Sequence, residues 1–502
     1  MSEKRSPWLE AEPAAPAGAT VPQRHPRGLL TLFLTEMWER FSYYGMRALL
    51  VLFMVDQVRG GLGLDDRTAT AIYGIYTAAV YLMSLPGGWL ADRVCGARRA
   101  VWYGGMIIAA GHFTLAIPRT ETFYLGLVLV VVGSGLLKPN MSALVAELYP
   151  EGGARRDAGF TIFYMGVNLG AFMGPLVCSA LGEKINWHYG FGAAGVGMVA
   201  GLIQFRFSHG RLGAAGLQRG NSRPLNPAER VGLAGGLTAA VVVVGLALAG
   251  VVKINPLSLA QGMSAVILGI GALYFAGVFL LCGLDTREKQ RVAIILVLFL
   301  ASALFWAGFE QAGSSFNLFA ARMTERHWFG WEIPAGWFQS LGAIFIIIFA
   351  PLFASLWLRL ARRNLDPSIP VKFALGLLLL AAGFLVMAAA AKVVIAGKLA
   401  GPGWLVSTYL LHTFGELCLS PVGLSSVTKL SPRKLVGQMM GLWFLGTSLG
   451  NLLAGLLAGE FNVAPVSQWP AIYLKIIIAP VMAGGLLIAL AGPIRRWMAG
   501  VK

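Results

Sequence analysis

The sequence predicts an all-helical protein that crosses a membrane many times. Its 502 residues are 57% hydrophobic and only 13% charged, whereas a soluble domain is about 25% charged. The mean hydropathy is +0.68. The apolar residues gather into long stretches, and the 64 glycines suit helices that approach one another closely in lipid. These observations exclude an ordinary soluble domain.

Apolar stretches of roughly bilayer length follow one another along the chain. They lie at residues 28–56, 67–91, 99–118, 122–149, 157–182, 187–207, 229–252, 257–283, 291–321, 335–360, 371–392, 402–429, 433–459 and 470–494. We therefore expect fourteen membrane-spanning helices. An even number of spans leaves both termini on one side of the membrane.

Alternate loops between these stretches are rich in arginine and lysine. The rich loops include Arg93, Arg98 and Arg99, Arg155 and Arg156, Arg206 to Arg230, Arg287 to Arg291, Arg359 to Lys372, and Lys429 to Lys434. The intervening loops hold only scattered bases. Because cytoplasmic loops of membrane proteins carry the excess of arginine and lysine, we expect both termini in the cytoplasm.

Composition shifts divide the chain. Residues 1–27 are rich in proline, alanine and charge, which predicts a disordered cytoplasmic tail rather than a signal peptide. A charged, glycine-rich stretch at 208–230 precedes two very apolar spans. We predict an N-terminal six-helix bundle at 28–207, a linker with an accessory transmembrane hairpin at 208–290, and a C-terminal six-helix bundle with a short tail at 291–502. Alternatively, the two spans complete the core bundle.

The first span carries an unusual set of charges. Glu36, Glu39, Arg40 and Arg47 lie within an otherwise apolar stretch. One charge at the bilayer centre costs about 2.5–3.5 kcal/mol on insertion scales, so such residues indicate function. With about 3.6 residues per turn, these four and Tyr43 share one stripe of the helix.

Composition and motifs also exclude other classes of protein. The net charge of +17 is dispersed between apolar segments, whereas nucleic-acid binding requires basic residues gathered on one soluble face. The four cysteines, Cys95, Cys178, Cys282 and Cys418, form no CxxC pair, so we expect neither disulfides nor a metal site. Residues 446–450 match GxSxG, but that nucleophile motif needs a strand before it, and here it lies in a glycine-rich apolar helix.

Buried charges of opposite sign come from the two halves of the chain. Arg47 and Lys138 lie in the first half, and Glu310 and Glu416 in the second. Such pairs can form gates when the halves meet, and protonation of a carboxylate would release its partner. The alternative is a set of static salt bridges that fix helix register.

Several motifs resemble those of one family, the proton-coupled oligopeptide transporters of the major facilitator superfamily. The motifs are EMWERFSYY at 36–44, the loop GGWLADRVCGARR at 87–99, KPN at 138–140, FTIFYMGVNLG at 160–170, FEQAGS at 309–314 and GELCLSPVGLS at 415–425. Residues 28 to about 495 share the resemblance. The spans at 231–283 are similar to the extra hairpin of bacterial members. In the last motif, Ser420 and Pro421 interrupt a span and form a candidate hinge.

The resemblance implies a transport mechanism and a role for each matching residue. Proton coupling would involve Glu36, Glu39, Arg40 and Glu310. Arg47 with Glu310 would form the periplasmic gate, and Lys138 with Glu416 the cytoplasmic gate. The substrate-binding set would be Tyr43, Tyr44, Arg47, Tyr81, Lys138, Asn168, Trp306, Glu310, Glu416, Ser420 and Trp443. Within this set, Arg47 and Lys138 would hold the peptide carboxylate and Glu416 the peptide amine.

One position departs from the family pattern. After residues 338–341 the family usually has an asparagine that helps to bind the peptide amine, and this chain has Gly342. The amine would then depend more on Glu416. We expect a weaker or differently selective site.

The resemblance therefore implies a proton-driven symporter of di- and tripeptides, working as a monomer in the inner membrane of a bacterium. It implies no cofactor besides the coupling proton, and no nucleic-acid partner. One alternative is the same scaffold carrying nitrate, another small anion or a drug-like substrate. Another is a receptor that binds peptides without moving them.

Overall fold

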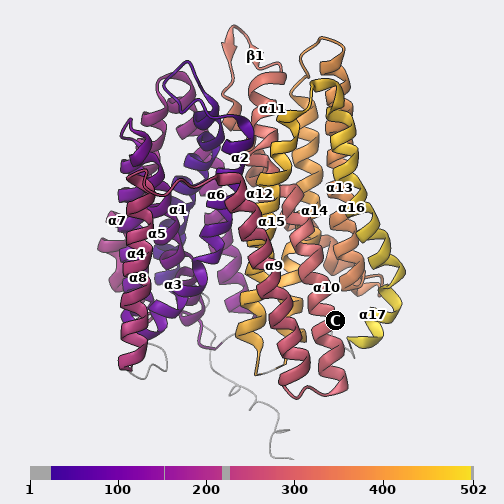
Figure 1. The fold of residues 1–502 in the computed structure, drawn as a ribbon. Helices are drawn as coiled ribbons and strands as arrows, with labels where there is room; N and C mark the ends of the chain where they lie inside the picture. The colour runs from indigo at the N-terminus through magenta and orange to yellow at the C-terminus, as the bar shows by residue number, and fades with distance from the viewer. Residues whose placement is uncertain (1–23, 152, 218–225, 433, 499–502) are drawn as a thin grey trace, which may run out of the picture.

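The computed structural model describes residues 24–151, 153–217, 226–432 and 434–498. The tail predicted at 1–27 therefore falls almost wholly outside the described residues. The described chain is helical nearly throughout, and its helices stand side by side in two groups, indigo to purple on the left of Figure 1 and pink to yellow on the right.

The first group contains the helices that precede the accessory pair. They are α1 (Gly28–Val55), α2 (Asp66–Leu82), α3 (Ser84–Leu90), η1 (Ala91–Cys95), α4 (Ala97–Leu115), α5 (Thr120–Glu147), α6 (Gly153–Lys184), α7 (Trp187–Ser208) and η2 (His209–Leu212). Asp65 begins α2 by accepting a hydrogen bond from the Thr68 amide at 2.9 Å. Within the group, α1 packs against α6 and α7, and α4 against α5.

One predicted loop is shorter than expected. The motif at 87–99 was described as a loop, but the chain stays helical through α3 and the π-helical turn η1 as far as Cys95. The helix breaks at Gly96. Its φ of 80° is a backbone conformation that glycine adopts more readily than other residues. Gly87 is instead a packing residue, because a Cβ there would lie 1.9 Å from the Gly135 oxygen of α5.

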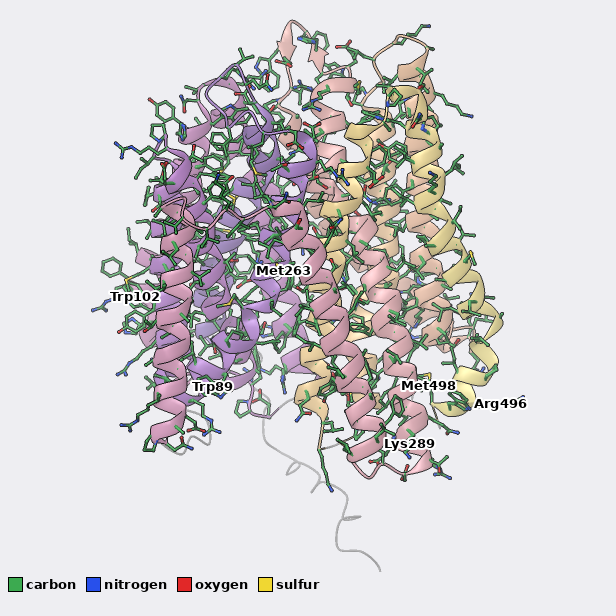
Figure 2. The ribbon with its side chains drawn as sticks, in the orientation of Figure 1. Trp89, Trp102, Met263, Lys289, Arg496 and Met498 are labelled. Carbon is green, nitrogen blue, oxygen red and sulfur yellow. The ribbon has the colours of Figure 1, made fainter. Side chains whose placement is uncertain are left out.

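The accessory pair follows as α8 (Pro227–Leu248) and α9 (Pro256–Leu281). Asn226 and Glu229 form a capping box at the start of α8. No described residue of α8 is buried, whereas α9 packs against α2 and α15, and its Met263 lies in front of the junction of the two groups in Figure 2.

The second group completes the chain. It contains α10 (Thr286–Phe309), η3 (Glu310–Gly313), α11 (Ser315–Met323), β1 (His327–Trp328), β2 (Trp331–Glu332), η4 (Ala335–Gln339), α12 (Ser340–Arg362), α13 (Ile369–Ile395), α14 (Gly403–Leu430), α15 (Val436–Val463), η5 (Val466–Gln468), α16 (Trp469–Ala489) and α17 (Ala491–Trp497). The two strands form a short antiparallel hairpin. We call the end of the molecule that carries this β-hairpin the hairpin end; the name does not refer to the accessory transmembrane hairpin of α8 and α9.

A second expectation about helix ends was also wrong. Pro421 was expected to interrupt its span, but α14 runs without a break from Gly403 to Leu430 with Pro421 inside it. Neighbouring helices and serine or threonine side chains can satisfy the backbone groups that a proline frees. Whether α14 bends at this point during function stays a prediction.

The two groups touch through α2 with α15 and through α6 with α12. A Cβ on Gly455 of α15 would lie 2.5 Å from the Thr70 oxygen of α2, so this contact requires a glycine. Nearby, Ser448 donates its hydroxyl proton to the Ala78 oxygen at 2.9 Å. The GxSxG pentapeptide thus lies in a helix at an interface, as the sequence predicted.

Eleven helical stretches in the described ranges are long and apolar enough to cross a membrane. The chain is therefore a multi-pass, all-helical membrane protein. Three of the predicted spans, which form α1, α4 and α14, are not among the eleven. In α1 the charged residues Glu36, Glu39, Arg40 and Arg47 make the span less apolar than the others.

Candidate functional site

The charged residues of α1 are all buried inside the first group of helices. Nε of Arg40 lies 2.7 Å from Oε1 of Glu36 and 2.9 Å from Oε2 of Glu39. Only the contact with Glu36 has the geometry of a hydrogen bond. The stripe that periodicity predicted on the first span is therefore a single ion cluster at this point.

This cluster has more acid than base. When both carboxylates are ionised, Glu36 and Glu39 share one guanidinium, which leaves one negative charge uncompensated. Within the described chain, Oε2 of Glu36 and both carboxylate oxygens of Glu39 have no hydrogen-bond partner. A buried negative charge that lacks hydrogen bonds and shares its only ion-pair partner is costly, so the cluster is suited to take up a proton.

Lys138 of α5 lies close to this cluster but is not paired with it. Its Nζ lies 3.9 Å from the centroid of the Tyr81 ring and 5.3 Å from that of Tyr43. Among the residues that the structure describes, this ammonium has no hydrogen-bond partner. Aromatic faces attract a cation only modestly, by about 0.5–2 kcal/mol, so the ammonium remains available for an anionic ligand.

Arg47 joins the two groups of helices nearer the hairpin end. Its guanidinium forms an ion pair with the Glu310 carboxylate and donates a second hydrogen bond from Nε to the Tyr73 hydroxyl. Glu310 opens the short η3 turn that separates α10 from α11. This break in the helix places the carboxylate opposite α1.

The second predicted gate is not formed. Glu416 of α14 is buried, and its Oε2 has no hydrogen-bond partner in the described ranges. No ion pair joins it to Lys138 anywhere in the described part of the chain. The structure thus brings Arg47 to Glu310 and leaves Lys138 and Glu416 apart.

Three further predicted residues lie beside these charges in the first group. Tyr44 lies 5.5 Å from the Arg47 guanidinium, and Tyr43 stacks on Tyr76 with a centroid distance of 6.3 Å. Asn168 donates from Nδ2 to the Tyr164 oxygen of its own helix at 2.9 Å, so its Oδ1 is turned elsewhere. The sequence predicted Tyr43, Tyr44 and Asn168, and it omitted Tyr73 because that residue carries no signal of its own.

The predicted site residues of the second group differ in their burial and contacts. Trp306 packs edge-on against Phe305 and Phe309, and its Nε1 is buried without a partner in the described ranges. Ser420 is half-buried. Trp443 is buried, and its ring packs edge-on against that of Phe373.

Two more positions bear on the site. Gln339 has a buried Nε2 without a partner among the described residues. Three residues further along, a Cβ built on Gly342 would meet no atom within 4 Å. Space for a larger side chain therefore exists where the sequence departs from the family pattern.

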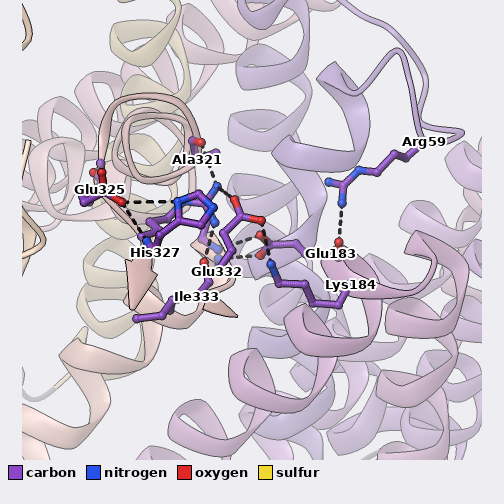
Figure 3. Close-up of polar contacts among 12 residues, drawn as sticks. Arg59, Glu183, Lys184, Ala321, Glu325, His327, Glu332 and Ile333 are labelled. Carbon is purple, nitrogen blue, oxygen red and sulfur yellow. Dashed lines mark hydrogen bonds and ion pairs between the residues drawn. The ribbon is translucent and has the colours of Figure 1, made fainter. Parts of the chain in front are cut away.

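Further ion pairs between the two groups lie at the hairpin end. Arg322 of α11 binds both oxygens of Asp66 at the start of α2. Lys184 at the end of α6 binds Glu332 of β2 at 2.8 Å, as Figure 3 shows. Sequence analysis missed both pairs, because their residues lie at the ends of spans where charged residues are common.

Comparison with known proteins gives one consistent family. A model of the POT family matches residues 98–474. The peptide transporter YePEPT of Yersinia enterocolitica is 44% identical over 487 residues, which cover 94% of this chain and 95% of that protein. A di-/tripeptide transporter of Lactococcus lactis is 35% identical over 492 residues, covering 95% and 97%. A crystal structure of a peptide transporter with sulfate has 43% identity and a TM-score of 0.88, covering 96% and 98%.

Proposed function

Because the chain belongs to the POT family of transporters, we propose that it imports di- and tripeptides together with protons, by alternating access to one central site. Relatives at 44% and 35% identity are named as peptide and di-/tripeptide transporters. The chain is accordingly a secondary transporter and not an enzyme.

The observation that carries the proposal is that two buried groups of opposite charge, Lys138 and Glu416, each have a polar atom without a hydrogen-bond partner in the described chain. Among the described residues, the Lys138 ammonium and Oε2 of Glu416 are both buried without hydrogen-bond partners, and they come from opposite halves of the chain. A short peptide is a zwitterion, so it needs a fixed cation for its carboxylate and a fixed anion for its amine. In our proposal Lys138 and Arg47 bind the carboxylate and Glu416 binds the amine.

The remaining residues of the proposed site are uncharged. Tyr44 and Asn168 hold the peptide backbone, while the side-chain pockets are lined by Tyr43, Tyr81, Trp306, Ser420 and Trp443. Hydrogen bonds to the backbone and aromatic walls discriminate little between side chains, which suits a carrier of many different peptides. Glu310 reaches the peptide once the Arg47 ion pair opens.

Proton coupling follows from the two buried ion clusters. A proton taken up by Glu310 releases Arg47, which opens the gate and frees the guanidinium for the peptide. Glu36 and Glu39, with Arg40, form the second proton-binding group. One charge moved through 100 mV provides about 2.3 kcal/mol, which biases accumulation roughly fiftyfold. No cofactor besides the proton is required.

We propose that the molecule contains fourteen membrane spans in the arrangement of the major facilitator superfamily. Bundles at 28–207 and 291–502 flank the linker and hairpin at 208–290. The basic residues support cytoplasmic termini, because Lys289 and Arg496 lie at the end opposite the β-hairpin (Figure 2). The hairpin end then faces the periplasm, and the protein lies in the inner membrane. A monomer suffices, since one chain supplies both sides of the site.

In this orientation we propose that the described conformation is shut towards the periplasm. Arg47 and Glu310, Asp66 and Arg322, and Lys184 and Glu332 are paired at or towards the hairpin end. No corresponding pair joins Lys138 to Glu416 among the described residues. The site would therefore be accessible from the cytoplasm.

The decisive experiment uses Glu310→Gln in proteoliposomes. A glutamine cannot take up the coupling proton, so we expect peptide counterflow to persist while pH-driven uptake is lost. Glu325→Gln, which changes a half-exposed carboxylate of the hairpin region, should retain both activities. Undiminished pH-driven uptake in Glu310→Gln would reject the assignment. If uptake is competed by nitrate but not by dipeptides, the alternative anion substrate is correct.

A further inference from the structure

Glu183 is a buried carboxylate that the proposed transport mechanism does not use. It lies one residue before the end of α6, at the hairpin end, and is only 8% exposed. Its Oε2 accepts a hydrogen bond from the Ala335 amide at 2.7 Å, and its Oε1 accepts one from the Gly336 amide at 2.8 Å. A residue of the first half thus binds the backbone of the second half with both oxygens.

These two amides begin a long helical stretch. Ala335 is the first residue of η4, which continues into α12 as one stretch of 28 residues ending at Arg362. The first amides of a helix have no partner within the helix, and a negative charge is favourable beside them. Helices are usually capped by a nearby residue of the same segment, whereas here Glu183 of α6 supplies the cap across the junction.

The surroundings hold the carboxylate in this position. Arg59 donates to the backbone oxygen of Glu183, and the next residue, Lys184, binds Glu332 (Figure 3). Glu332 also pairs with Arg326 at 2.7 Å. The contact between Glu183 and η4 therefore lies beside one ion pair that spans the two halves, Lys184 with Glu332, and each partner's half adds a polar contact of its own.

The side chains of α6 also pack closely against η4 at this point. A Cβ on Gly336 would lie 2.0 Å from Oγ of Ser179, one turn before Glu183 on α6. Ser340 donates to the Phe172 oxygen at 2.8 Å further down the same junction. The capped amides consequently lie at one end of a tightly packed interface between α6 and α12.

From this geometry we propose that Glu183 is a positioning residue for transport, which holds the periplasmic gate shut by capping η4 across the two halves. The inference rests on the proposed alternating access. When the site opens to the hairpin end, α6 and η4 separate, and the carboxylate must leave both amides. Glu183 does not touch the peptide or the proton-binding clusters, so it sets the balance between closed and open states and not the affinity of either state for substrate.

The test measures this balance directly, without substrate. Spin labels replace two exposed residues at the hairpin end, Val58 after α1 and Lys398 after α13. Cys95 and Cys282 are changed to serine, since the other two cysteines are buried. In reconstituted full-length protein, the two labels are close in the closed state and far apart in the open state. We expect Glu183→Gln to raise the ratio of the population with the long distance to that with the short distance about tenfold. A glutamine has one oxygen for two amides, and its NH2 group opposes the second amide.

Two variants make the outcome unambiguous. Glu325→Gln alters a carboxylate of the same region whose ion pair with His327 stays within one half, so it should leave the distances unchanged. Gly336→Ala should lengthen them by steric conflict with Ser179 while Glu183 stays intact. If Gly336→Ala lengthens the distances and Glu183→Gln does not, the capping proposal is wrong although the halves do exchange. If no variant and no pH change alters the distances, alternating access at this end is wrong as well.

Discussion

Lys138 and Glu416 are the residues on which the proposed substrate site depends most. Each is a buried ionisable group with a polar atom that lacks a partner in the described chain, and such groups cost about 1–3 kcal/mol or more when left unsatisfied. Membrane helices tolerate this cost where the charge serves function. A ligand with one charge of each sign would relieve both costs at once, which is the physical basis for the proposed binding of a zwitterion.

At Gly342, we expect substitution by asparagine to tighten dipeptide binding. A Cβ at this position meets no atom within 4 Å, so the larger side chain fits, and its amide oxygen adds an acceptor for the peptide amine. A neutral hydrogen bond contributes about 0.5–1.5 kcal/mol, or roughly a two- to tenfold gain in affinity. The change in affinity is measured by the competition of a panel of dipeptides with the uptake of a labelled peptide.

The control for this variant is Gly485→Asn. Gly485 is an exposed glycine of α16 whose added Cβ also meets nothing within 4 Å, so the change in helix propensity is matched and the site is untouched. Its affinities should equal those of the parent. Should Gly342→Asn leave the affinity for every dipeptide unchanged, Gly342 does not influence selectivity.

The sequence predicts which side chains share a helix face better than it predicts contacts between the two halves. Periodicity placed Glu36, Glu39 and Arg40 together because helical spacing fixes which side chains share a face. The missing pair between Lys138 and Glu416 depends on how the halves are arranged, and one sequence serves several arrangements. Tyr73 was missed because its value comes only from contact with Arg47.

At the scale of elements, glycines control how closely α2 and α15 approach. We expect Gly455→Ala to destabilise the fold, because its Cβ would lie 2.5 Å from the Thr70 oxygen and backbone cannot move aside cheaply. Overpacking of this kind costs about 1–3 kcal/mol. A lower melting temperature in detergent would measure it. Gly262→Ala in α9, where an added Cβ meets nothing within 4 Å, should not lower it.

The accessory pair should show an asymmetric response to mutation. Phe275 of α9 is 3% exposed and packs against Phe299 of α10 at a ring distance of 5.9 Å, so Phe275→Ala should destabilise by about 3–5 kcal/mol. Leu237→Ala in α8 should have almost no effect, since Leu237 is exposed. Thermal unfolding in one detergent compares them. Equal losses would mean that α8 packs more tightly than its exposure indicates.

Element boundaries show where sequence patterns stop being informative. Every predicted apolar stretch contains a helix, because apolar length is a strong signal in membrane proteins. The errors came at glycine and proline. Gly87 opens the motif that was described as a loop, and Pro421 was expected to interrupt its span, yet both lie inside helices whose neighbours accommodate them.

At the scale of the whole molecule, several polar contacts between the halves lie at or towards one end of the described chain. The pairs formed by Arg47 with Glu310 and by Lys184 with Glu332, together with the Glu183 cap, lie at or near the hairpin end. They differ in depth, since the first is buried and the second is partly exposed. Only a buried pair changes its energy strongly on protonation, so these contacts should divide into proton sensors and passive latches.

The pair of Lys184 and Glu332 should be a passive latch. The hydrogen bond from Lys184 lowers the pKa of Glu332 below its ordinary value of 4.5, with Arg326 and His327 acting in the same direction and partial burial opposing them. A lowered pKa means that the stabilisation is present above pH 4.5 and is lost only as the pH falls through the lowered pKa. Between about pH 5.5 and 7.5 the pair stays ionised.

Glu332→Gln should therefore shift the label-distance ratio equally at every pH in that range and leave the pH midpoint of opening unchanged. The shift should be at most about fivefold, because a partly exposed pair contributes about 0–1 kcal/mol. Asp366→Asn is the matched control, since Asp366 pairs with Lys372 at 2.8 Å within one half and should change neither quantity. A displaced midpoint in Glu332→Gln would make Glu332 a proton sensor and would require a second protonation step at the gate of the hairpin end.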